Sequence, residues 1–142
     1  MVNKQTIYSK IIISLTGLLI AFGVGNILSA LFNFILDIRA GASNVEILVY
    51  GLIIVLSIIG LVILTIFFIK LYDMAPNVIK WTHITCGYLI FQGTYLAILG
   101  LFSDGLIALI GFLVESALVL LFWITFVNHL KKIQNATSMP SS

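Results

Sequence analysis

LIGFLVESALVLLFW, residues 109–123, is an apolar stretch interrupted by a single carboxyl group, that of Glu115. The apolar character extends over residues 105–127. A helix needs about 20 mostly apolar residues to cross the ~30 Å hydrocarbon core of a bilayer. The stretch therefore predicts a transmembrane helix with one ionisable side chain inside it.

The composition of the whole chain supports a membrane environment. Of its 142 residues, 61% are apolar and only 8% are charged, against about 45–50% and about 25% in ordinary soluble domains. The mean hydropathy is +1.22. Twelve charged side chains cannot cover the surface of a water-soluble fold of this length. The net charge of +2 is too small and too dispersed to favour direct nucleic-acid binding.

Four segments have the length and composition of membrane spans. We place them at residues 11–36, 47–69, 81–102 and 105–127. The connectors are short, which favours neighbouring antiparallel helices. The fold class expected is an all-α integral membrane protein, an up-down bundle of four transmembrane helices forming one domain over residues 1–136. The segment QNATSMPSS, residues 134–142, has a disordered composition, and residues 137–142 are expected to form a flexible tail.

The basic residues indicate the orientation. Six lysines fall on one side of the predicted spans and only Arg39 falls on the other; the lysines are Lys4, Lys10, Lys70, Lys80, Lys131 and Lys132. The positive-inside rule then predicts a multi-pass protein of the cell membrane with both termini in the cytoplasm. The first span is too long for the apolar core of a signal peptide, so we expect it to be retained.

Each predicted span carries one hydrogen-bonding side chain about ten residues from its outer end. At 1.5 Å per residue, these side chains lie about 15 Å deep, near the bilayer centre. We call them the polar layer: Asn26, Ser57, Gln92 and Glu115.

Glu115 has three interpretations. A lone charge at this depth costs several kcal/mol, and no Lys or Arg lies within a predicted span to pair with it. The carboxyl group is either protonated and hydrogen-bonded within the polar layer, locking the helices in register, or part of a proton or ion relay. Alternatively, it docks a transmembrane helix of a partner.

The first span carries a row of small residues at intervals of four positions. The small-residue row consists of Gly17, Ala21, Gly25 and Ser29, and Asn33 continues it. In lipid, such rows allow two helix backbones to approach closely. We expect this face to be buried against protein, either within the chain or against another subunit.

The lysines at the cytoplasmic ends of the spans form what we call the basic face: Lys70, Lys80, Lys131 and Lys132. Such a face determines topology and attracts anionic lipid, or it docks a cytosolic protein. His83 and His129 fall near the same boundary and are able to meet, but two ligands alone are a weak indication of a metal or haem site. Cys86 is expected to be a packing residue.

Two segments of the second half resemble a known family. Trp81 and His83 open the third span, and the chain closes its last span with FWITFVNHLKKIQNA, which contains Trp123, Asn128, Lys131, Lys132, Ile133 and Asn135. Over residues 66–136 the chain resembles four-span membrane proteins of Gram-positive bacteria that are associated with LytTR-type transcription regulators. The resemblance implies a non-catalytic membrane regulator that acts through a partner.

The sequence therefore predicts a non-enzymatic protein without cofactor or metal. Its partners are expected to be the lipid bilayer and either another protein or further copies of itself, as a regulator or an accessory subunit of a membrane complex. The alternative is a transporter or channel component in which Glu115 is the titrating group.

Overall fold

The computed structural model describes residues 7–103 and 105–138, and these residues form four α-helices. The helices are α1 (Ile7–Ala40), α2 (Asn44–Tyr72), α3 (Val78–Ser103) and α4 (Leu106–Ser138). No strand occurs in the described ranges. Each helix is long and apolar enough to cross a membrane. The prediction of an all-α membrane protein with four spanning helices is confirmed, and the chain is a multi-pass membrane protein.

The helices extend beyond the predicted spans and include polar residues at their ends. The difference is largest in α4, which runs to Ser138 rather than ending near residue 127. Residues 134–138, whose composition suggested disorder, are part of this helix. Lys131, Lys132 and Gln134 are good helix formers, and no Gly or Pro occurs between Gly111 and Pro140. Residues 139–142 lie outside the described residues.

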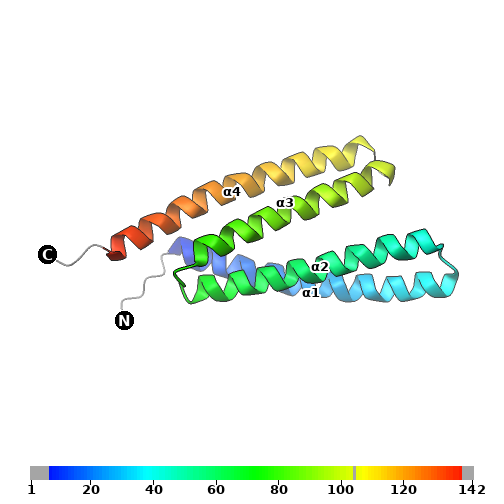
Figure 1. Ribbon diagram of the computed structural model, residues 1–142, viewed down its shortest axis with the longest axis horizontal. Coiled ribbons are helices and arrows are strands. Elements are labelled where there is room, and N and C mark those ends of the chain that lie inside the picture. Colours follow the sequence, from blue (N-terminus) through cyan, green and yellow to red (C-terminus); the bar gives the residue numbers. More distant parts are fainter. Residues whose placement is uncertain (1–6, 104, 139–142) are drawn as a thin grey trace. The chain divides into compact units, whose positions relative to one another are not determined.

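The chain divides into two compact units. In its described part, one unit contains α1 and α2 and the other contains α3 and α4, and each is an antiparallel pair of helices (Figure 1). We call them the first hairpin (residues 7–73) and the second hairpin (residues 74–138).

A short turn closes the first hairpin. Gly41 has φ +85°, a left-handed conformation that ends α1 at little steric cost because glycine lacks a Cβ. Ser43 then caps α2: its Oγ accepts a hydrogen bond from the backbone N–H of Glu46 at 3.3 Å. In return, the Glu46 carboxylate accepts from the backbone N–H of Ser43 at 2.8 Å. This capping box satisfies amide groups that a helix N-terminus otherwise leaves without partners.

Glycines set the register of the first hairpin. A Cβ placed on Gly23 would lie 3.2 Å from Leu61, and one placed on Gly17 would lie 3.4 Å from the Phe68 ring. These contacts place residues 17–23 of α1 beside residues 61–68 of α2.

The second hairpin has a tighter turn, with Gly105 at φ +59°. A Cβ on Gly93 would lie 3.3 Å from the Phe112 ring, so α3 and α4 approach closely in the middle of the hairpin. At the other end of α4, the Gln134 side-chain amide donates a hydrogen bond to the Pro76 carbonyl at 3.3 Å. The hairpin is therefore held at its middle and at its open end.

Hydroxyl groups inside the helices bond to the same helix. Thr16, Ser57, Thr65, Thr82 and Thr94 each donate to the carbonyl oxygen four residues earlier, at 2.7–2.9 Å. This local bonding lets hydroxyl side chains enter a membrane helix without a partner on another helix.

Candidate functional site

Glu115 lies on the side of α4 that meets α3 at Gly93. Its Oε2 is 3.8 Å from the position that a Cβ on Gly93 would occupy. The absence of a side chain at Gly93 leaves room for the carboxylate there, but Glu115 is nevertheless exposed. Among the residues that the structure describes, none hydrogen-bonds to or pairs with this carboxylate.

The polar layer contains two pairs of residues, one in each hairpin. In the second hairpin, the contact between Gly93 and Glu115 places Gln92 at nearly the same level as Glu115. Gln92 is half-buried, and no hydrogen bond joins it to Glu115 within the described part of the hairpin. The two side chains share a level without being bonded.

In the first hairpin, the Gly23–Leu61 contact places Asn26 and Ser57 at nearly the same level. Ser57 donates to the Ile53 carbonyl at 2.8 Å, so its proton is used within α2. Asn26 is exposed. Of these two described side chains, only the Ser57 hydroxyl is bonded within its own helix.

The small-residue row of α1 lies largely outside the contact with α2. Gly17 packs against Phe68, but Ala21, Gly25 and Ser29 are exposed, and no atom lies within 4 Å of a Cβ placed on Gly25. On a helix, Gly25 and Ser29 project away from the face that carries Gly23. The first hairpin itself therefore does not bury this face.

An interaction missing from the sequence prediction links α3 to α4. The indole Nε1–H of Trp123 donates a hydrogen bond to Nδ1 of His83 at 2.6 Å, and the ring centroids are 5.5 Å apart. His83 thus contacts a tryptophan, a neighbour that the sequence did not indicate. The antiparallel register could have indicated this pair, since both rings were expected at the same membrane boundary.

The basic face is distributed over both hairpins. Lys80, Lys131 and Lys132 are exposed on the second hairpin, and Lys70 is half-buried on α2 of the first. Lys131 and Lys132 lie on the part of α4 that extends beyond its apolar segment, close to Gln134 and its bond to Pro76. The second hairpin therefore presents three ammonium groups on regular helix.

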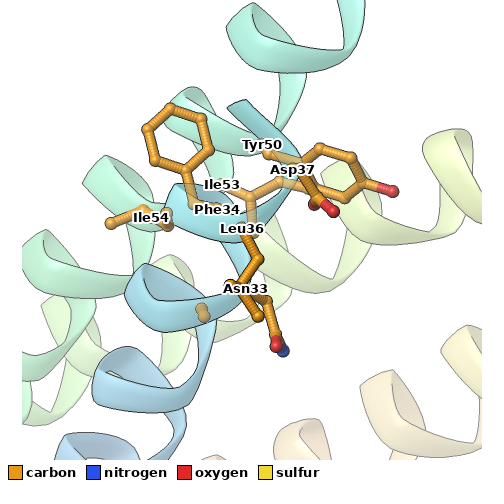
Figure 2. A pocket seen from close by; sticks show the side chains of 8 residues that line it. Asn33, Phe34, Leu36, Asp37, Tyr50, Ile53 and Ile54 are labelled. Carbon is orange, nitrogen blue, oxygen red and sulfur yellow. The ribbon is translucent and has the colours of Figure 1, made fainter. Parts of the chain in front are cut away.

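Sequence reasoning did not predict a cleft that lies near the turn of the first hairpin. Its volume is about 450 Å³, within the range of small-molecule sites. Ala30 lines it together with the residues labelled in Figure 2, which are Asn33, Phe34, Leu36, Asp37, Tyr50, Ile53 and Ile54. Asn33 and Asp37 are four residues apart and therefore share a face of α1. This spacing of two polar residues is the sequence feature that could have indicated a polar site on α1.

Other candidate chemistry is sparse. Cys86 is a buried free thiol. Within residues 7–103 and 105–138, no three His, Cys, Asp or Glu side chains group as metal ligands. The comparison of this chain with protein-family models, with curated proteins and with solved structures gives no match.

Proposed function

We propose that this chain is a non-enzymatic membrane protein that works through protein–protein contacts, as a membrane regulator of a cytosolic partner or an accessory subunit of a membrane complex. The observation that carries the proposal is the exposed Glu115 carboxylate, which the second hairpin leaves without a bonded partner. Its neighbours Val114 and Leu118 are exposed apolar side chains of the kind that face lipid or another helix.

Energetic cost explains why this carboxyl group favours a partner. An ionisable side chain at the bilayer centre costs several kcal/mol unless it meets a hydrogen-bonding or charged group. A partner helix that supplies such a group relieves this cost when it binds. Binding then depends on Glu115, which gives the contact specificity.

The small-residue row supports the same function from the first hairpin. Gly25 and Ser29 are exposed and project away from α2. Close approach of a second helix along such a row gains dispersion contacts that bulkier side chains prevent. A partner helix or a second copy of the chain is the occupant we propose.

The lysines support the proposed orientation, with both termini in the cytoplasm of the cell. Lys131 and Lys132 on the extension of α4 then face the cytosol. The resemblance to four-span proteins associated with LytTR-type regulators is carried partly by these residues, and it is consistent with a cytosolic partner at the basic face.

Purification from native membranes tests the function. Wild-type protein should co-purify with a partner chain or as an oligomer, Glu115→Gln should keep most of this association, and Glu115→Leu should lose it. All three should keep the same helical content by circular dichroism. A strictly monomeric wild-type protein with no co-purifying chain would contradict the proposal.

A second function, transport with Glu115 as the titrating group, is favoured by the exposure of this carboxylate. Liposomes that contain wild type or Glu115→Gln distinguish the two functions. Proton or cation flux that is above background for wild type and abolished in Glu115→Gln supports transport. Equal background flux in both excludes it.

Thiol labelling of intact cells tests the orientation. A cysteine at Arg39 should react with a membrane-impermeant reagent, whereas one at Lys131 should not. The native Cys86 is buried and serves as the background. Labelling at Lys131 would reverse the proposed topology.

A further inference from the structure

We propose that the cleft of the first hairpin binds an amphiphilic ammonium compound, with its cationic group at Asp37 and its hydrocarbon part along the apolar wall. This inference does not depend on the proposed function: it involves neither Glu115 nor the exposed Gly25 and Ser29, although Asn33, which continues the small-residue row, lines the cleft. It rests on the composition of the cleft, on its position along the helices, and on the absence of a bonded partner for the Asp37 carboxylate among the described residues.

The cleft has a polar part and an apolar part. Asn33, Asp37 and Tyr50 supply an amide, a carboxylate and a phenol, and the other lining side chains are hydrocarbon: Ala30, Phe34, Leu36, Ile53 and Ile54. In Figure 2 the Asp37 carboxylate and the Tyr50 phenol project in the same direction. A ligand that fits both parts has a charged or polar head and an apolar body.

The position of the cleft matches the boundary between hydrocarbon and water. Asp37 is the first residue after the apolar segment 11–36, and Gly41 ends the helix one turn later. Head groups of lipids and of other amphiphiles lie at this depth. An amphiphile in the bilayer therefore reaches the cleft without leaving its preferred depth.

The sign of the charge follows from Asp37. Among described residues, no ion pair or hydrogen bond engages its carboxylate. Arg39 is two positions away, and side chains at that spacing do not face each other on a helix. The other described carboxylate near this turn, Glu46, is used by the capping box. An ammonium group would pair with the Asp37 carboxylate. It would meet no repulsion, since none of the described lining residues is basic.

Aromatic rings make an ammonium group a better occupant than a metal ion. Tyr50 and Phe34 both line the cleft, and aromatic faces attract organic cations. The described lining residues offer only one carboxylate, whereas hard divalent cations prefer several oxygen ligands. Both the head group of phosphatidylethanolamine and a free alkylamine carry this chemistry.

Native mass spectrometry of the full chain, released from phosphatidylglycerol nanodiscs doped with phosphatidylethanolamine, measures retention of the lipid. The wild type should retain phosphatidylethanolamine in preference to phosphatidylglycerol. Asp37→Asn should weaken this retention by about tenfold, the equivalent of ~1.4 kcal/mol. Asp73→Asn, which removes a carboxylate outside the cleft, should retain it as the wild type does.

Dodecylammonium in a parallel titration distinguishes the two sources. Preferential retention of phosphatidylethanolamine identifies its head group as the occupant. Binding of dodecylammonium without such retention identifies a free amine. Dodecyl sulfate should bind in neither case. Ile53→Trp fills the cleft and keeps Asp37, so it should also abolish binding. Equal retention of both phospholipids together with no binding of dodecylammonium, or undiminished binding by folded Asp37→Asn, would overturn the proposal.

Discussion

The indole of Trp123 on α4 donates a hydrogen bond to His83 on α3, at 2.6 Å between Nε1 and Nδ1. Nδ1 must be unprotonated to accept this bond, so a neutral His83 carries its proton on Nε2. The bond joins the two helices of the second hairpin about one third of the way from its open end to the turn at Gly105. It therefore fixes the register at a level where no glycine contact does so.

Trp123→Phe should destabilise the second hairpin because it removes this bond and keeps an aromatic ring. The loss in free energy of unfolding should be about 1 kcal/mol, the usual net value of one hydrogen bond. Denaturant titration in micelles measures it. Trp81→Phe is the matched control, and an equal effect of both substitutions would show that the bond contributes nothing.

Gly93→Leu should separate α3 from α4. A Cβ at this position already lies 3.3 Å from Phe112, so a larger side chain overpacks the contact at a cost of about 1–3 kcal/mol. Gly111→Leu is the control, because no atom lies within 4 Å of a Cβ there. Disulfide trapping between cysteines placed on the two helices measures their separation. Similar trapping of both variants would contradict the contact.

Gly25→Leu should leave the first hairpin intact and prevent association along the small-residue row. Gly17→Leu should instead disturb the hairpin, because a Cβ on Gly17 lies 3.4 Å from Phe68. Chemical crosslinking in membranes measures the loss of association in Gly25→Leu. Circular dichroism during denaturation measures the disturbed hairpin in Gly17→Leu. Unchanged crosslinking of Gly25→Leu would remove the row from the association surface.

Ser43→Ala should fray the start of α2, since it removes the side-chain oxygen that accepts the Glu46 N–H. Loss of such a cap costs about 1 kcal/mol. Amide hydrogen exchange over residues 44–47 should speed up accordingly. Asn44→Ala is the control, and equal exchange in both variants would mean that the capping box does not protect this turn.

The helices were predictable because lipid imposes a strong rule. Backbone groups in hydrocarbon must bond within the segment, so apolar runs such as residues 47–69 become helices. Their polar ends were less predictable, because Lys131 and Gln134 are compatible with both helix and coil. Tertiary contacts, such as the bond from Gln134 to Pro76, are not visible in a window of sequence.

The depth of the candidate site in the bilayer stays a prediction. Counting along the spans placed Glu115 and Gln92 at one level, and the contact at Gly93 puts them at nearly the same level of the second hairpin. Counting does not show which neighbour a side chain meets, and so it missed the pairing of His83 with Trp123. The cleft at Asp37 was missed because clefts arise from helix separation, which composition does not encode.

The pairing of helices that follow one another in the chain has a consequence for biogenesis. When only α1 and α2 of the nascent chain have emerged from the ribosome, both partners of the Gly17–Phe68 and Gly23–Leu61 contacts are already present. Insertion during synthesis should therefore proceed two segments at a time, and a nascent chain whose residues up to Asp73 have left the ribosome should hold a finished pair.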